Sequence, residues 1–268
     1  MRLGIIASGG QDADGAIAKV RELGFPTCQV RAENHGDELA MRLKSALERY
    51  QIEATALVVL GPGPMVWDFY QGPLTIGLVP RETRRKRIDS LKRGSDFARK
   101  CGIPALHTHC GFIPENPNDP LYAETVEAIR EVASHCRANG QLFLYETGQE
   151  TPVTLLRAIQ DVALDNQGVN LDTANLILYG KGNPVDALDV IGNYVRGLHA
   201  KDGLYPTDPR HLGQEVPIGQ GKVDFSLIIQ RLKELRYRGP ITIEREISGP
   251  QQIEDTRKAK VYLEKLIG

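Results

Sequence analysis

Cysteine is scarce in this sequence, and long apolar runs are missing from it. The four cysteines are widely separated and form no CxxC pair, which in a chain of this size indicates reduced thiols that are mostly buried. No segment approaches the roughly 20 apolar residues that a membrane-spanning helix needs, and the apolar run near the N-terminus is too short for a signal peptide. We therefore expect a soluble, cytoplasmic protein with no membrane partner.

The chain also lacks an excess of charge of either sign. It has 33 basic and 34 acidic residues and a formal net charge of −1, so no overall field attracts nucleic acid or anionic lipid. This balance argues against a nucleic-acid partner. The 268 residues, 41% of them hydrophobic, suit one large core better than two small ones, which predicts a single domain over residues 1–268.

Short runs rich in Val, Ile and Leu alternate with longer amphipathic runs along the whole sequence. The first pair is "LGIIAS" followed by "DADGAIAKVRELG", and the last is "PITIERE" followed by "GPQQIEDTRKAKVYLEKLIG". Eight such strand-helix pairs predict parallel strands, and eight units in about 250 residues match a (β/α)₈ TIM barrel of the α/β class. A doubly wound open sheet is the alternative, because the number of units does not show closure.

Glycines and long connections mark the ends of the predicted elements. Four glycines each follow a helical run and precede a strand, where a left-handed helix cap is expected. Two connections, residues 62–82 and 204–223, are unusually long, which is typical of lids and binding loops. Both follow strands, so in a barrel both would lie on the C-terminal face that carries active sites. The four glycines are Gly24, Gly102, Gly140 and Gly239.

Polar side chains stand at the ends of four consecutive predicted strands. Carboxylates that converge at a barrel mouth repel one another unless a positive charge neutralises them. A divalent cation would do so, and oxygen ligands with one imidazole suit Mn²⁺, Mg²⁺, Co²⁺ or Zn²⁺. The alternative is a set of unrelated charges that face solvent. In strand order the residues are Glu146, Asp172, His199, and then Glu244 with Glu246.

Several segments resemble one known family. They are "YETGQET" (145–151), "NLDTANLILYGKGNP" (170–184), "GLHAKDG" (197–203), "PIGQGKVDF" (217–225) and "GPITIERE" (239–246). On these residues the chain resembles the xylose isomerase-like barrel superfamily, the sugar phosphate isomerase/epimerase group that includes D-tagatose 3-epimerase, hydroxypyruvate isomerase, inosose dehydratase and endonuclease IV. The similarity extends over essentially the whole chain, and its motifs are more specific for the fold and the metal site than for the substrate.

The resemblance implies a metal site and a reaction. In the ketose 3-epimerases of this group, the last four strands supply Glu, Asp, His and Glu ligands, which correspond here to Glu146, Asp172, His199 and Glu244. One divalent ion, expected to be Mn²⁺, would bind the carbonyl and the adjacent hydroxyl of an open-chain keto sugar and acidify the carbon-bound proton between them. Glu146 and Glu244 would be the catalytic pair that removes this proton from one face and returns one to the other.

The sequence departs from those epimerases around the implied metal site. Asn175 stands where they have a histidine, three residues after the aspartate ligand. Pro152 stands where they have a glutamate, six residues after the first ligand, and Glu150 lies nearby instead. Tyr205 stands where they have an arginine, six residues after the histidine ligand, and Lys201 lies nearby. The groups that orient the sugar hydroxyls therefore differ, and the substrate of those epimerases does not carry over directly.

Two histidines and a lysine are candidates for substrate contact. His107 and His109 are two residues apart on a strand, so both would point into the barrel mouth. Core histidines satisfied by their neighbours are the alternative. Lys201 shares a face with His199, where it would either contact substrate or form a structural ion pair. Asp202 alternates to the other face, and we expect it to support the loop that follows.

The first long loop and the helix after it add two features. Trp67 lies in an aromatic cluster of the loop, where it would stack on a sugar or anchor the loop. The basic run "RETRRKR" (81–87) is typical of a helix start with charges mostly on a solvated face, and it is the only hint of a phosphorylated substrate. The predicted substrate-binding residues are His107, His109, Lys201, Asn175, Trp67 and Glu246.

Three functions remain open on the sequence alone. The leading one is a metal-dependent isomerase or epimerase that acts on a keto sugar or derivative. The second is a lyase, either a dehydratase or a deglycosidase of 3-keto-glycosides, that uses the same proton abstraction before elimination. An endonuclease IV-like activity needs more histidine ligands and a basic face, and six histidines at a net charge of −1 argue against it. The resemblance also implies a homodimer or homotetramer.

Overall fold

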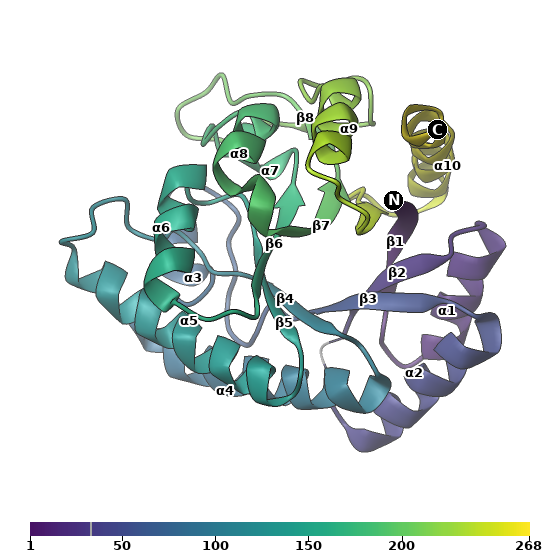
Figure 1. Ribbon diagram of the computed structural model, residues 1–268, viewed down its shortest axis with the longest axis horizontal. Helices are drawn as coiled ribbons and strands as arrows, with labels where there is room; N and C mark the ends of the chain where they lie inside the picture. The colour runs from purple at the N-terminus through teal and green to yellow at the C-terminus, as the bar shows by residue number, and fades with distance from the viewer. Residues whose placement is uncertain (33) are drawn as a thin grey trace.

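A computed structural model of the protein describes residues 1–32 and 34–268, in which a ring of strands closes on itself (Figure 1). Neighbouring strands of the ring are parallel, and β1 pairs with both β2 and β10. The predicted TIM barrel is confirmed, and the open-sheet alternative is wrong because this last pairing closes the sheet. The ring contains β1 (Arg2–Ser8), β2 (Thr27–Arg31), β3 (Glu53–Val58), β4 (Ala105–His109), β5 (Leu142–Glu146), β6 (Gln167–Asp172), β7 (Val195–Ala200) and β10 (Pro240–Ile243).

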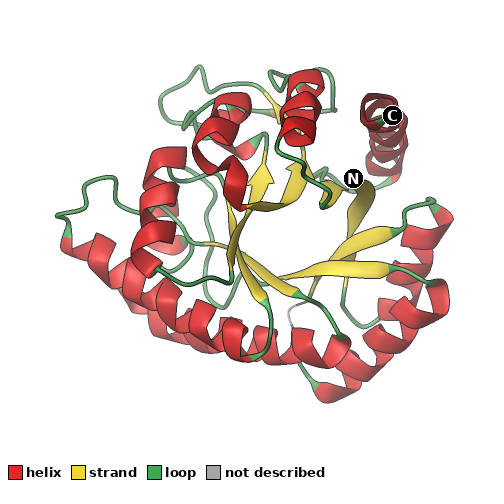
Figure 2. Cartoon of the chain, viewed as in Figure 1, coloured by secondary structure: helices red, strands yellow, loops and turns green. Residues whose placement is uncertain are grey.

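Helices cover the outside of the barrel (Figure 2). The long ones are α1 (Ala13–Glu22), α2 (Asp37–Tyr50), α4 (Arg81–Cys101), α5 (Pro120–Ala138), α6 (Pro152–Val162), α8 (Pro184–Ile191), α9 (Phe225–Glu234) and α10 (Pro250–Ile267). Shorter pieces lie in the connections. They are α3 (Gly72–Thr75), α7 (Asn175–Leu178), the 3₁₀ turn η1 (Gly192–Tyr194), and an antiparallel pair of two-residue strands, β8 (Asp202–Gly203) and β9 (Glu215–Val216).

Local sequence fixes where several helices begin. Backbone N–H groups in or next to the first turn donate to the side chains of Asp12, Asp119, Thr151, Asn183 and Asp224. Such caps stabilise a helix by about 1 kcal/mol each. Proline occupies the first turn of α5, α6, α8 and α10, where its missing N–H is not needed. The loops that surround the C-terminal mouth of the barrel are therefore anchored at the helix starts.

The inside of the barrel changes from apolar to polar along its axis. Lower in the barrel, Ala56, Ala105 and Leu144 form a small buried apolar cluster, separate from the large core between strands and helices. Alternation along a strand puts His107 on the face of Ala105 and Glu146 on the face of Leu144, each one step closer to the C-terminal end. Polar groups thus gather at one end of the barrel above an apolar floor.

The first long loop, between β3 and α4, is fixed by a buried arginine. Arg87 is 1% exposed and donates to the carbonyl oxygens of Pro62 at 3.1 Å, Pro64 at 2.9 Å and Gly77 at 2.8 Å. The charges of residues 81–87 lie mostly on a solvated face, as expected, and Arg87 is the exception because its guanidinium binds three loop carbonyl groups. The start of the helix at this run is confirmed.

The second long loop, between β7 and α9, is fixed by an aspartate. Asp202 is 1% exposed, and its carboxylate accepts hydrogen bonds from the backbone N–H groups of Gly203, Gly219, Gly221 and Val223 at 2.9 to 3.1 Å. A β-carbon on Gly221 would lie 2.1 Å from the Asp202 Oδ1, so this close approach requires glycine. The predicted supporting role of Asp202 is confirmed, and both ends of the loop are tied to one side chain.

One of the four predicted glycine caps is wrong. Gly24, Gly102 and Gly140 have positive φ angles of 73°, 75° and 70°, as expected for left-handed caps. Helix α9 ends earlier, at Glu234, so the left-handed position falls on Arg236, whose φ is 56°. Gly239 packs against Tyr237 instead, since a β-carbon there would lie 2.5 Å from the Tyr237 ring.

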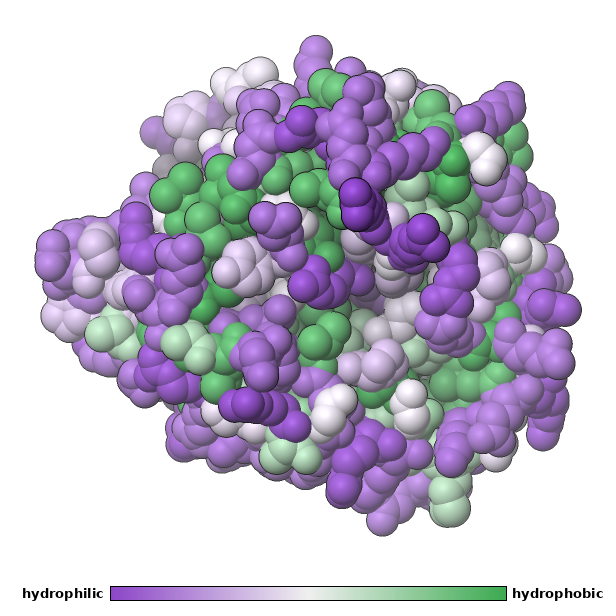
Figure 3. Space-filling model, viewed as in Figure 1, coloured by the Kyte–Doolittle hydropathy of each residue, from purple (hydrophilic) through white to green (hydrophobic). Residues whose placement is uncertain are grey.

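The surface and the cysteines agree with the composition. Hydrophilic residues cover most of the face drawn in Figure 3, and hydrophobic ones show as smaller patches between them. Within the described part of the chain, no helix combines the length and apolar character that crossing a membrane requires. The cysteines are unpaired and buried, as predicted; they are Cys28, Cys101, Cys110 and Cys136.

Candidate metal centre

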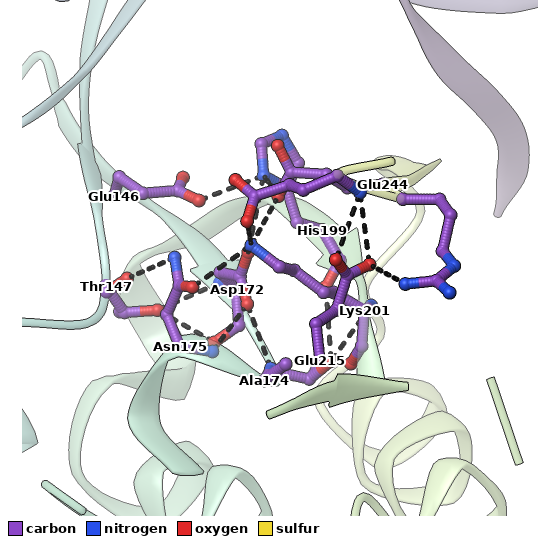
Figure 4. A network of polar contacts seen from close by, with 12 residues as sticks. Glu146, Thr147, Asp172, Ala174, Asn175, His199, Lys201, Glu215 and Glu244 are labelled. Carbon is purple, nitrogen blue, oxygen red and sulfur yellow. Dashed lines mark hydrogen bonds and ion pairs between the residues drawn. The ribbon is translucent and has the colours of Figure 1, made fainter. Parts of the chain in front are cut away.

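The four predicted ligands come together at the C-terminal mouth of the barrel. Glu146, Asp172 and His199 lie on β5, β6 and β7, and Glu244 directly follows β10. One ligand atom from each lies within 4.8 Å of the others. The Nδ1 atom of His199 is 2.9 Å from Oε1 of Glu146, 3.2 Å from Oε2 of Glu244 and 3.7 Å from Oδ2 of Asp172. Figure 4 shows Glu146 and Glu244 with this imidazole, together with Asp172 and Lys201.

The donor atoms fit a divalent cation. Nε2 of His199 lies 2.8 Å from Oε1 of Gln29, which can only accept, so Nε2 carries a proton, and Nδ1 presents a lone pair to the carboxylates once its own proton has left. A lone pair facing three carboxyl groups is repulsive unless a cation lies between them. Nδ1 of His199 and Oδ2 of Asp172 are also buried without a hydrogen-bond partner. Three carboxyl groups and one imidazole nitrogen suit Mn²⁺, Mg²⁺, Co²⁺ or Zn²⁺.

The titration of these groups shows the same need for positive charge. Burial opposes ionisation of Glu146 and Glu244, but nearby positive charges outweigh it: His199 and His107 lower the pKa of Glu146, and Lys201 and His199 lower the pKa of Glu244. Burial raises the pKa of Asp172 to about 7. Burial also opposes protonation of His199, but the carboxylates of Glu146 and Glu244 raise its pKa well above the usual value. Without a metal, protons on Asp172 and His199 therefore offset part of the negative charge of the carboxylates. A bound cation would displace these protons.

A chain of amide side chains orients the ligands. Nε2 of Gln29 on β2 donates to Oδ1 of Asn170 at 2.9 Å, and Nδ2 of Asn170 donates to Oε2 of Glu146 at 2.6 Å. With the contact between Gln29 and His199, this chain links two of the predicted ligands across the barrel interior. Gln29 was not among the site residues predicted from the sequence. The available signal was one polar residue inside the buried strand "TCQVR".

Replacing Gln29 with leucine is expected to weaken metal binding about 10- to 100-fold, because partners of this kind fix the tautomer and orientation of a histidine ligand. The dissociation constant of Mn²⁺ would be measured by calorimetry on the chelator-treated protein. Gln160→Leu on the exposed side of α6 is the matched control. Equal Mn²⁺ affinity in the Gln29 variant and the native protein would contradict the orienting role.

Lys201 stands beside the predicted metal ligands and is fully enclosed. Its Nζ lies 3.0 Å from Oε2 of Glu246 and 3.4 Å from Oε2 of Glu244, and it donates to Oδ1 of Asn175 at 3.2 Å. Asn175 in turn donates to the backbone oxygen of Thr147 at 3.3 Å. Of the two predicted roles for Lys201, the ion pair is present in this structure. Asn175 (Figure 4) and Glu246 hold the amine in place.

The two histidines of β4 have different surroundings. His107 contacts Glu146 through Nε2, its Nδ1 is buried without a partner, and it forms a second ligand group with Glu146 and His199. His109 lies 3.2 Å from Oε1 of Gln149, and its ring meets Trp67 edge-on with 4.8 Å between centroids. Burial lowers the pKa of His109 to about 4, so its ring is neutral near pH 7. His107 therefore belongs to the ligand cluster, and His109 connects that cluster to the first long loop.

Glu150 is a buried acidic side chain in the connection after β5. It is 2% exposed, and its Oε2 has no hydrogen-bond partner among the described residues. Burial raises its pKa from 4.5 to about 8. The folded protein therefore holds a proton on Glu150 that the unfolded chain releases above about pH 4.5. This difference lowers the free energy of unfolding as the pH rises from about 4.5 through about 8.

Replacing Glu150 with glutamine is expected to stabilise the metal-free protein above about pH 8 by a few kcal/mol and to change little near pH 4.5. Urea unfolding of both proteins across this pH range would measure the effect. Glu48→Gln on the exposed side of α2 is the control. If the stability of the variant and the native protein fell equally with pH, Glu150 would not be the buried acid.

Comparison with known proteins extends these observations. The model of one protein family, described as the xylose isomerase-like TIM barrel, matches residues 17–266. The chain belongs to this family. A relative in Methanocaldococcus jannaschii, named "Uncharacterized protein MJ1311", is 32% identical over 94% of this chain and 84% of its own length.

Solved structures show the same xylose isomerase-like barrel. A xylose isomerase domain protein from Planctomyces limnophilus is 37% identical and has a TM-score of 0.93 over 99% of this chain and 96% of its own. A D-psicose 3-epimerase crystallised in the presence of D-fructose is 18% identical and has a TM-score of 0.75 over 100% of both chains. At that identity the likeness to the epimerase shows the fold alone. The roles of the individual site residues in this barrel therefore stay predictions.

Proposed function

We propose that this protein is a divalent-metal-dependent sugar isomerase or epimerase that moves a proton on the carbon beside the carbonyl of a keto sugar or derivative. The observation that carries the proposal is the convergence of Glu146, Asp172, His199 and Glu244 at the barrel mouth. Consecutive elements of one rigid barrel supply these groups, which is the placement of catalytic residues in TIM-barrel enzymes. Structural neighbours with the fold include proteins named as sugar epimerases.

These four residues would hold the cation, which when bound supplies Lewis-acid polarisation of substrate oxygens. Mn²⁺ is the ion we propose. The protein itself supplies the proton transfers. Glu146 comes from β5 and Glu244 from the end of β10, and both carboxylates reach Nδ1 of His199. Both have a lowered pKa, which favours the carboxylate form that can accept a proton. One, as the carboxylate, would take the proton from the substrate carbon. The other, after taking up a proton from solvent, would deliver it to the opposite face.

The neighbouring groups would position the sugar. The amine of Lys201 lies between Glu244 and Glu246, where a substrate oxygen that displaced one of these contacts would accept a hydrogen bond from it. His109 and Trp67 meet edge-on on the other side of the mouth. An aromatic ring offers a flat apolar surface to the C–H face of a sugar. This arrangement supports a small sugar substrate whose carbonyl end faces the ligands.

Incubation in D₂O tests the proposal directly. Keto sugars and 3-keto-glycosides would be screened by NMR with the Mn²⁺-loaded protein. Isomerisation or epimerisation incorporates deuterium into a product of the same composition. A lyase, the second candidate, gives a product of lower mass or a released aglycone after the same proton abstraction. Failure of every substrate to exchange its proton with the Mn²⁺-loaded protein would refute both reactions.

A further inference from the structure

Arg31 ends strand β2 directly above the amide chain of the candidate metal centre. Gln29 points into the barrel, because its side chain contacts His199 and Asn170. Side chains two residues apart on a strand share a face, so Arg31 points inward as well, about 7 Å nearer the C-terminal end. Unlike Gln29, Arg31 is exposed. Its guanidinium therefore belongs to the wall of the barrel mouth.

Three neighbouring cavities open around Arg31, which lines all of them. One of about 630 Å³ lies between β1, α1 and α10 and also borders Glu244 and Glu246. A second of about 540 Å³ borders Arg93 and reaches Trp67. These two spaces extend from a predicted metal ligand, past Arg31, to the aromatic loop. The side of the mouth formed by β1, β2 and β3 thus has room for the part of a substrate that lies beyond its reacting carbon.

The third cavity, of about 600 Å³, carries an excess of positive charge. It borders Arg31 and Arg42, and no carboxylate of the described chain lines it. The cavity shared by Arg31 and Arg93 has no described carboxylate either. Within residues 1–32 and 34–268, Arg31 and Arg93 make no ion pair, and Arg42 has only a 3.9 Å contact with exposed Glu38. Three guanidinium groups therefore border open space that no carboxylate of residues 1–32 or 34–268 fills.

The basic run of residues 81–87 is different, because its arginines are already engaged. Arg81 and Arg84 bind Glu124, Arg85 binds Glu131, and Arg87 binds loop carbonyls. The hint of an anionic substrate in that run is therefore not supported by its contacts. The available positive charge lies at Arg31, the last residue of β2. This residue was not among the site residues predicted from the sequence.

We propose that Arg31, flanked by Arg42 and Arg93, binds a carboxylate or phosphate group of the substrate whose carbonyl end lies at the candidate metal centre. A guanidinium binds either anion with two parallel hydrogen bonds. The substrate class is thus an acidic keto-sugar derivative, either a sugar acid or a phosphate ester. This inference rests on the proposed function for the reacting end of the substrate, and the anion subsite can be tested without it.

Binding to the metal-free protein tests the subsite. Inorganic phosphate and acetate would each be titrated into chelator-treated protein and followed by calorimetry. Arg31→Gln is expected to weaken binding of at least one of these anions tenfold or more, and Arg31→Lys to weaken it less, because lysine keeps the charge but not the fork. Arg99→Gln is the matched control, because this exposed arginine at the C-terminal end of α4 lines none of the three cavities. Unchanged affinity in the folded Arg31→Gln protein, or no binding of either anion to native protein, would overturn the inference.

Turnover by the Mn²⁺-loaded protein identifies the anion. A neutral keto sugar, its carboxylate derivative and its terminal phosphate ester would be compared by kcat/KM. Preference for the carboxylate or the ester assigns the group, and Arg31→Gln should reduce that preference about 100-fold. A preference for the neutral sugar that Arg31→Gln leaves unaltered would overturn the subsite while the proposed function stands. Anion binding that depends on Arg31, without proton exchange on any substrate, would refute the proposed function while the subsite stands.

Discussion

Replacing Glu146 or Glu244 with glutamine is expected to lower kcat about 10²- to 10⁴-fold, the usual contribution of a positioned acid or base. Glutamine has nearly the same size and keeps one oxygen for a cation, but it cannot accept the substrate proton. Both carboxyls are enclosed by the ligand cluster and have a lowered pKa. Each is therefore ionised in the native protein, and each substitution removes a base that is ready to act.

The two variants should also separate the two faces of the substrate. If each carboxylate serves one face, a single variant loses net epimerisation but keeps exchange of one hydrogen with D₂O through the remaining base. NMR would follow exchange and product formation together, and the metal content of each variant would be measured alongside. Glu48→Gln, far from the mouth on α2, is the control. A variant with full metal content and native kcat would remove that carboxylate from the mechanism.

Removing divalent cations is expected to abolish activity and to lower the melting temperature of the protein. A ligand present at about 1,000 times its dissociation constant stabilises the folded state by about 4 kcal/mol. In a domain of this size, each kcal/mol corresponds to about 2 to 4 °C, so a shift of about 10 °C is expected. The physical reason is the repulsion among Glu146, Asp172 and Glu244, which a cation relieves.

Calorimetric scans before and after chelation, and after addition of Mn²⁺ or Mg²⁺, would measure this shift. Asp172→Asn is a useful companion, because it removes one ligand charge while nearly keeping the side-chain shape. The variant should melt with little dependence on added metal. Elemental analysis that finds no divalent ion, together with melting that no added ion changes, would remove the metal from the proposal.

Much of the fold and of the candidate site could be predicted from local patterns. Alternating strand and helix runs predict the barrel because each βα unit has the same short-range signals. The predicted ligands follow from the same logic: parallel strands all end at one edge, so polar residues at their ends meet. Glu146, Asp172 and His199 needed only this argument and the resemblance of their segments to a known family.

Contacts between distant segments could not be predicted in this way. Gln29 reaches His199 across 170 positions of the chain, and nothing near Gln29 in the sequence indicates that partner. Arg87 stands in a basic run that is otherwise mostly solvated. Its burial could not be predicted, because the loop carbonyl groups that it binds are brought together only by the folded loop. The predicted cap at Gly239 was wrong for a local reason: helix α9 ends at Glu234, so the left-handed residue is Arg236.

The hydrogen bonds of Asp202 have a consequence for how this barrel can diversify. One carboxylate holds Gly203 at the start of the second long loop and Gly219, Gly221 and Val223 at its end. The residues between these points do not take part in that fastening. The segment between β8 and β9 can therefore be lengthened, shortened or exchanged while β7 and α9 stay in register. A change in this one segment would alter the rim of the barrel mouth, where a substrate would enter. The strands that carry the predicted metal ligands would stay unchanged.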